Sequence, residues 1–178
     1  AHIASPYIDI TFDENELMKY RQRMERWYWL VEELRGYSET KRQPIDDWMQ
    51  SKLHSHIAAV TKAMDAFEFR QATEDLYFGL YNDIQWYKRR GGTNKAVAQE
   101  LLSVIATLSC PFTPFFAEEL WESIGKGFVV QQQWPAVHES LLLSSAGVQE
   151  ELVSTAMTDI QTVKELTGMT DPQKIVLF

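Results

Sequence analysis

A long apolar segment ends abruptly at Pro111, and a second proline, Pro114, follows three residues later. Proline suits the first position of a helix because its missing N–H is not needed there, and Thr113 can cap the helix that begins at Pro114. Gly125 offers a left-handed residue at which this helix can end. The expected buried face of the helix consists of Phe116, Leu120 and Ile124. The sequence therefore predicts two helices joined by a tight turn at residues 110–113.

Four further segments repeat apolar residues every three or four positions, which is the spacing of amphipathic helices. We expect these helices over residues 13–36, 44–64, 69–90 and 94–109. Asp13 with Glu16 and Asp65 with Glu68 have the spacing of capping boxes, and Asn94 can cap the fourth segment. Helices joined by short loops pack as antiparallel neighbours. The predicted fold class is all-α, an antiparallel helical bundle of about five helices.

We expect the bundle to span residues 13–135, with different structures on either side of it. Residues 1–12 mix proline with β-branched residues and are expected to form a linker. Residues 136–178 are expected to form a connecting loop, a C-terminal helix and the start of a truncated C-terminal domain. That helix would run from about Val148 to Thr167, with Leu152, Ile160, Val163 and Leu166 facing inward. Short strands are predicted at Phe128–Val130 and at the terminal run Lys174–Phe178.

Two features predict that the chain is a piece of a longer protein. A strand at Lys174–Phe178 would find no partner strand in a helical chain, and a lone strand is not stable. Trp27, Tyr28 and Trp29 are consecutive and would sweep about 200° around a helix, so one core cannot bury all three. We expect these three aromatic residues to form a surface for a neighbouring domain or a protein partner.

Composition excludes several classes of protein. The net charge is −8, whereas a protein that binds a polyanion usually presents a basic surface, so any contact with nucleic acid must come from a local basic patch. No segment has the roughly 18 to 20 consecutive apolar residues of a membrane span. The single cysteine, Cys110, cannot form an intramolecular disulfide, which is typical of the reducing cytoplasm. We expect a cytoplasmic protein with no membrane partner.

No catalytic residue and no metal site are predicted. His54 and His56 are two residues apart on a helix, so they point about 200° away from each other and cannot chelate one metal. The carboxylate pairs Asp46-Asp47 and Glu118-Glu119 both fall in a first helical turn, where stabilising the helix dipole is sufficient reason for them. Cys110 is expected to be a small buried residue and not a nucleophile.

The order of residues from Cys110 to Glu122 resembles a known family. Cys-Pro-Phe-Thr-Pro-Phe-Phe-Ala-Glu-Glu-Leu-Trp-Glu is similar to the Pro-Phe-x-Pro-x-x-Ala-Glu-Glu-Leu-Trp signature of the helical anticodon-binding domain in class I aminoacyl-tRNA synthetases. Ile45-Asp-Asp-Trp48, Trp86-Tyr-Lys-Arg-Arg90 and Trp134-Pro135 resemble further segments of the same domain, in the same order. The resemblance implies an all-α domain that holds tRNA.

The first predicted helix indicates which class I synthetase the chain resembles most. Its run Arg23-Met-Glu-Arg-Trp-Tyr-Trp-Leu30 is similar to one in archaeal and eukaryotic-type leucyl-tRNA synthetases. The resemblance implies a domain that positions leucine tRNA for aminoacylation by a leucine–tRNA ligase, packed against the catalytic domain of the same chain. The His-Ile-Gly-His-like and Lys-Met-Ser-Lys-Ser-like motifs of the adenylate-forming site are absent, so this chain is expected to be inactive alone. We therefore expect no cofactor here, with ATP and Mg²⁺ used by the complete enzyme.

Two alternatives remain open at this point. One is the corresponding domain of an isoleucyl, valyl or methionyl enzyme. The other is a helical protein-interaction module that uses the aromatic surface on the first helix.

Basic side chains form two clusters. One flanks the Gly91-Gly92 break, and the other lines the first helix and its following loop and consists of Arg21, Arg23, Arg26, Arg35, Lys41 and Arg42. We expect them to contact tRNA phosphates, with Trp86 available to stack on a base. Basic residues in a last helical turn also complement the helix dipole, and this alternative explains Lys88–Arg90 equally well. The candidate tRNA-binding residues are Trp86, Lys88, Arg89, Arg90, Lys95, Lys41 and Arg42.

Overall fold

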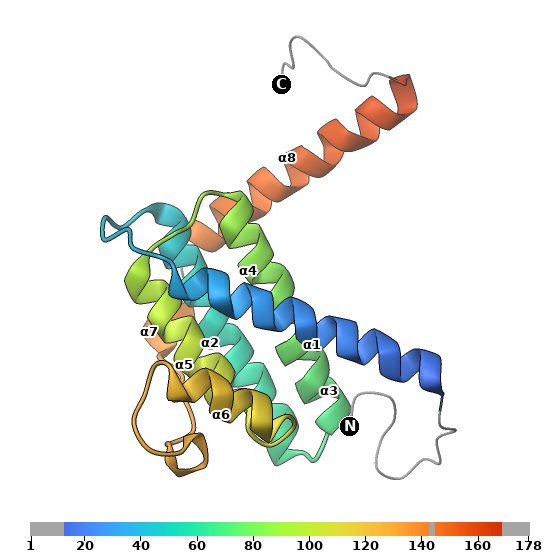
Figure 1. Ribbon diagram of the computed structural model, residues 1–178. Helices are drawn as coiled ribbons and strands as arrows, with labels where there is room; N and C mark the ends of the chain where they lie inside the picture. Colours follow the sequence, from blue (N-terminus) through green and yellow to red (C-terminus); the bar gives the residue numbers. More distant parts are fainter. Residues whose placement is uncertain (1–12, 143–144, 169–178) are drawn as a thin grey trace.

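The computed structural model describes residues 13–142 and 145–168, and this part of the chain is all-α, as predicted (Figure 1). No strand is found in these ranges; residues Glu39 and Asn94 form one isolated parallel bridge. The elements in chain order are α1 (Glu14–Arg35), α2 (Pro44–Asp65), α3 (Phe69–Glu74), the π-helical turn η1 (Asp75–Gly79), α4 (Leu80–Arg89), α5 (Lys95–Ser109), α6 (Pro114–Glu122), the 3₁₀ turn η2 (Val129–Gln131), α7 (Glu139–Leu142) and α8 (Ser145–Thr167).

Two of the predicted helix starts rest on the expected caps. The Asp13 carboxylate accepts the N–H of Asn15 at 2.8 Å, and the Asn94 side chain accepts the N–H of Ala96 at 2.9 Å. These bonds satisfy N–H groups that have no partner inside their own helix. Helix α6 begins at Pro114, as predicted, although Thr113 makes no capping bond with its side chain.

The predicted capping boxes do not form. The Glu16 carboxylate bonds Lys19 instead of the start of α1. Helix α2 continues to Asp65, and Glu68 precedes α3 without a side-chain cap. A capping box that the sequence analysis missed lies at the start of α2, where the N–H of Gln43 donates to Asp46 at 2.7 Å.

The helix predicted over residues 69–90 contains a π-turn. The N–H of Leu80 bonds the carbonyl of Asp75, five residues back, so this turn holds one residue more than an α-helical turn. Ala72 before the turn, Leu76 within it, and Leu80 and Ile84 after it are all fully buried. The π-turn thus keeps both halves of the helix facing the core.

The core lies between α2, α4 and α5, and its stripes agree with the predicted periodicity. Leu53, Ile57 and Val60 of α2 are at most 1% exposed and belong to the same core cluster as Leu101 and Ile105 of α5. Helix α1 lies across the other helices in place of running alongside them (Figure 1). Its buried residues are Trp27, Leu30, Val31 and Leu34, all in its second half.

Several other sequence expectations need correction. Helix α6 ends at Glu122, and Ile124, expected on its buried face, is exposed. Residues Val129–Gln131 form a 3₁₀ turn in place of a strand. Helix α8 packs on α2 near its start and then leaves the bundle (Figure 1), so Leu152, Val163 and Leu166 are exposed and do not face inward. The predicted linker 1–12 and terminal strand Lys174–Phe178 lie outside the described residues. None of the described helices is both long and apolar enough to cross a bilayer.

Candidate nucleic-acid interface

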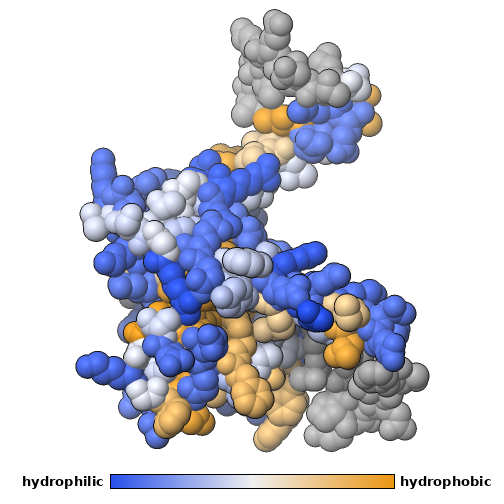
Figure 2. Space-filling model, viewed as in Figure 1, coloured by the Kyte–Doolittle hydropathy of each residue, from blue (hydrophilic) through white to orange (hydrophobic). Residues whose placement is uncertain are grey.

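One end of the bundle is built from two loops that are far apart in the sequence. The loop 36–43 between α1 and α2 lies beside the loop 90–94 between α4 and α5 (Figure 1). The N–H of Lys95 donates to the carbonyl of Glu39 at 2.8 Å, and this bond forms the bridge between the loops. The loop residues of the cluster on the first helix and its loop, Lys41 and Arg42, therefore meet the cluster that flanks Gly91-Gly92 at one end of the molecule, which we call the loop end. Figure 2 shows mainly hydrophilic colours at this end, at the upper left.

Tyr87 ties the loop end to the core. Its side chain is fully buried, and its hydroxyl donates to the Asp46 carboxylate and accepts the N–H of Asn94 at 3.1 Å. Burial, and then the hydrogen bond to Asp46, raise the pKa of the Tyr87 phenol, so it stays protonated and remains a donor. The start of α2, the end of α4 and the start of α5 are thereby held at a single hydroxyl group.

Gly92 allows this arrangement because its backbone passes directly against the Tyr87 ring. A Cβ atom at position 92 would lie 2.1 Å from that ring. Neither Tyr87 nor Gly92 was predicted as part of the site. The sequence signal that could have found them is the Gly91-Gly92 pair itself, since two glycines after a helix indicate a close approach of the backbone as well as a helix end.

Three of the six predicted basic side chains are already paired with acids. Lys88 bonds Glu33 of α1, and Arg42 donates to Asp47 at 2.6 Å. Arg90 binds Glu150 of α8.

The other three predicted basic side chains, Lys41, Arg89 and Lys95, form no salt bridge within the described residues. The Arg89 guanidinium lies 5.9 Å from the centre of the Trp86 ring. Glu39 lies two residues before Lys41, and the backbone N–H groups of Lys41 and Thr40 donate to its carboxylate and lower its pKa. The loop end is therefore a mixed surface with three cations available to a polyanion.

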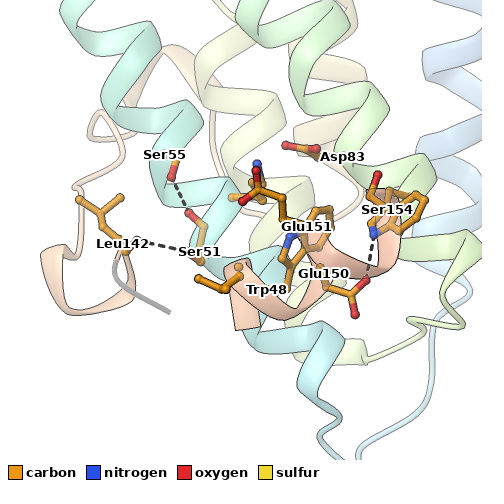
Figure 3. A pocket seen from close by; sticks show the side chains of 12 residues that line it. Trp48, Ser51, Ser55, Asp83, Leu142, Glu150, Glu151 and Ser154 are labelled. Atoms are coloured by element: carbon orange, nitrogen blue, oxygen red, sulfur yellow. Dashed lines mark hydrogen bonds between the residues drawn. The ribbon is translucent and has the colours of Figure 1, made fainter. Parts of the chain in front are cut away.

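Trp86 is not free to stack on an incoming base. It is half-buried, and its indole N–H donates to Glu150 at 3.0 Å. The ring lines an open pocket of about 810 Å³ between α2, α4, α7 and α8. Figure 3 shows Ser51 and Ser55 along α2 on one side of this pocket, and Glu150 and Ser154 of α8 on the other.

The aromatic surface predicted on α1 is smaller than expected. Trp27 is 1% exposed, and its indole N–H donates to the carbonyl of Tyr77 at 3.2 Å. Trp27 is thus a core residue and must be removed from the predicted partner surface. Tyr28 and Trp29 do face outward, 45% and 68% exposed, and their rings contact each other edge to face.

His54 and His56 point to different neighbours, as their spacing predicts. His54 bonds Glu100 of α5 at 3.2 Å, whereas His56 bonds Asp83 of α4 at 2.9 Å. Within residues 13–142 and 145–168, no group of three or more His, Cys, Asp or Glu side chains could hold a metal ion. Burial, and then the charge of Glu118, raise the pKa of the Cys110 thiol, which is the opposite of what a nucleophile needs.

Comparison with known proteins identifies the family. The sequence model of the family described as "Anticodon-binding domain of tRNA ligase" matches residues 46–177. The chain belongs to this family, and it is homologous to archaeal leucine–tRNA ligases over most of its length. It is 36% identical over 174 residues to the leucine–tRNA ligase of Methanocaldococcus jannaschii, a match that covers 96% of this chain and 18% of that protein. It is 34% identical over 164 residues to the Methanosarcina mazei ligase, covering 89% and 17%.

A solved structure has the same fold. It is the LeuRS of Agrobacterium radiobacter K84 agnB2, crystallised as a ternary complex with tRNA and LeuAMS. The TM-score is 0.61 at 23% sequence identity, and the match covers 76% of this chain and 18% of that one. The chain thus spans less than a fifth of the length of these relatives.

Proposed function

We propose that this chain is the tRNA-binding helical domain of a cytoplasmic leucine–tRNA ligase, and that it holds tRNA at the loop end. One observation carries the location: the backbone bond between Lys95 and Glu39 brings basic residues of two clusters that are far apart in the sequence onto one surface. Membership of the anticodon-binding family and homology to leucine–tRNA ligases support the rest. The leucine specificity rests on this homology.

The proposed role is to position tRNA and involves no chemical step. Phosphate contacts fix the register and orientation of a nucleic acid without reading its sequence. Arg89, Lys95 and Lys41 are the cations best placed for such contacts, because no acid among the described residues neutralises them in a salt bridge. The adenylate-forming chemistry, with its ATP and Mg²⁺, would belong to the catalytic domain of the complete ligase. Because the net charge is −8, we expect weak, salt-sensitive binding by this chain alone.

The double variant Arg89→Ala/Lys95→Ala tests this function. We expect its affinity for leucine tRNA to fall about 3- to 10-fold, and the slope of log K against log salt to shrink by about 0.7–0.9 for each phosphate that the variant no longer binds. Fluorescence anisotropy with labelled tRNA, at salt concentrations from about 50 to 200 mM, measures both quantities.

A matched control is Lys19→Ala/Arg21→Ala, which removes the same charge from the exposed first half of α1. If both double variants bind tRNA with the same affinity and the same salt slope, the loop end is not the binding site.

A second candidate function is protein binding through Tyr28 and Trp29. Their exposed rings contact each other on the outer side of α1, and exposed aromatic side chains are typical anchors of protein interfaces. Trp29→Ala would then abolish capture of the catalytic part of the ligase and leave tRNA affinity unchanged. If Trp29→Ala loses tRNA binding but still captures the catalytic part of the ligase, this second function is excluded.

A further inference from the structure

Glu150 is a buried acid that occupies the basic end of α4. It is 8% exposed, and its carboxylate accepts hydrogen bonds from two residues. Arg90 Nε donates to one oxygen at 2.9 Å and an Arg90 terminal nitrogen to the other at 3.2 Å. Trp86 Nε1 donates to the first oxygen at 3.0 Å. Three N–H donors from the end of α4 therefore converge on a single anion supplied by α8.

This donor arrangement does not require a carboxylate. A guanidinium that donates two parallel N–H bonds binds phosphate oxygens with the same fork geometry as carboxylate oxygens. The Arg90 side chain is 37% exposed, so the fork can be reached from solvent. It lies one residue from Arg89, which belongs to the loop end where we place the tRNA backbone.

Among the α8 side chains that the structure describes, Glu150 is the one that is buried. Beyond Glu150, Leu152, Val163 and Leu166 are exposed by 71%, 58% and 82%, and Val153, Met157 and Ile160 are only half-buried. Helix α8 leaves the bundle after its contact with α2 (Figure 1). Because so little apolar surface is buried, the contact between α8 and the bundle depends strongly on the bonds of Glu150.

We propose that Arg90 and Trp86 form a phosphodiester subsite, and that Glu150 occupies it as a carboxylate substitute until an RNA phosphate displaces it. Helix α8 is then a gate on tRNA binding: it covers the subsite in the free protein and is released when tRNA binds. This inference rests on the proposed function, because it adds one subsite to the loop end.

The variant Glu150→Gln tests the gate. The amide keeps an acceptor for Trp86 but loses the charge that holds Arg90, so the fold is retained while the competitor is weakened. We expect tRNA affinity to rise about 3- to 10-fold, with a salt slope steeper by about 0.7–0.9, as one additional phosphate contact requires. In the Arg90→Ala background the same substitution should give no gain.

The matched control is Glu151→Gln, which removes the same charge from the next residue, an exposed one that does not contact Arg90. An equal gain from Glu150→Gln and Glu151→Gln would show a general charge effect and overturn the proposal. No gain from Glu150→Gln, or the same gain with Arg90→Ala, would also overturn it.

A structural measurement is independent of affinity. The indole N–H resonance of Trp86, assigned by its disappearance in Trp86→Phe, should shift when tRNA is added to the wild-type chain, because its acceptor changes from Glu150 to phosphate. A resonance that stays in place at saturating tRNA overturns the gate while leaving the proposed function intact. If the wild-type chain and Glu150→Gln both fail to bind tRNA, the proposed function fails and the gate with it.

Discussion

At the scale of single residues, the structure depends on a few close approaches that side-chain chemistry alone does not reveal. Tyr87 fills the space beside Gly92 and bonds both Asp46 and the backbone of Asn94. A buried hydroxyl with two partners fixes its neighbours, because leaving either partner unpaired costs free energy. The geometry of the loop end therefore depends on an aromatic residue that does not itself contact solvent.

We predict that Gly92→Ala lowers the free energy of unfolding by about 2–4 kcal/mol, since its methyl group would overlap the Tyr87 ring. Urea denaturation followed by circular dichroism measures this. The control is Gly91→Ala, at a residue with φ +84° and no atom near the added carbon, where we expect about 1 kcal/mol from backbone strain alone. Equal losses of stability in the two variants would show that the close approach is unimportant.

At the scale of elements, helix periods and caps could be predicted, and contacts between distant segments could not. The stripes of α2 and α5, the start of α6 and the Asn94 cap are local patterns, and the structure confirms them. The bond between Glu39 and Lys95 is not local, and no pattern in either loop specifies it. The sequence placed six candidate basic residues in two clusters, but it could not indicate that Glu33, Asp47 and Glu150 would neutralise three of them.

The turn between α2 and α3 shows a backbone conformation that the sequence conceals. Phe67 has φ +58°, a left-handed conformation that is unfavourable for a residue with a bulky side chain, and its ring is 66% exposed. The predicted capping box at Asp65 and Glu68 assumed a helix start there. Helix α3 does begin at Phe69, but Asp65 is the last residue of α2, and the N–H of Glu68 bonds the carbonyl of Ala63 at 2.8 Å at the end of α2.

We predict that Phe67→Gly is more stable than Phe67→Ala by about 1–2 kcal/mol, because only glycine adopts this conformation without strain. Both variants remove the ring, so the difference between their free energies of unfolding isolates the backbone contribution. Denaturant titration of the pair measures it. If the alanine variant is equally stable, Phe67 is not strained in solution.

At the scale of the whole molecule, His54 connects three parts of the chain. It lies on α2 and is 2% exposed. Its Nε2 bonds Glu100 of α5, and its Nδ1 accepts the backbone N–H of His138. Since Nδ1 is an acceptor, the proton of the neutral ring lies on Nε2. Burial lowers the pKa of His54 despite the opposing effect of Glu100.

This burial predicts how stability depends on pH. Because the pKa of His54 is lower in the folded chain than its value near 6.5 in the unfolded chain, the unfolded chain binds the proton more readily. We expect the free energy of unfolding to be constant above pH 6.5 and to fall as the pH decreases below it, by at most about 1.4 kcal/mol per pH unit. Thermal or urea unfolding from about pH 7.5 to about pH 5.5 measures this.

The variant His54→Gln should remove this part of the slope. A slope that persists unchanged in His54→Gln would assign the pH dependence to another group.

The π-turn at Asp75–Gly79 also determines where the length of this chain can vary. The turn already absorbs one extra residue, whose loss would restore an ordinary α-helical turn. In the regular helix α4 each residue rotates the chain by about 100°, so losing one residue there would rotate everything that follows by that angle. Tyr87 would then leave Asp46, and the three N–H donors of Trp86 and Arg90 would no longer face Glu150. Insertions and deletions within Leu80–Arg89 should therefore be rejected during evolution, even at positions where almost any amino acid would be accepted.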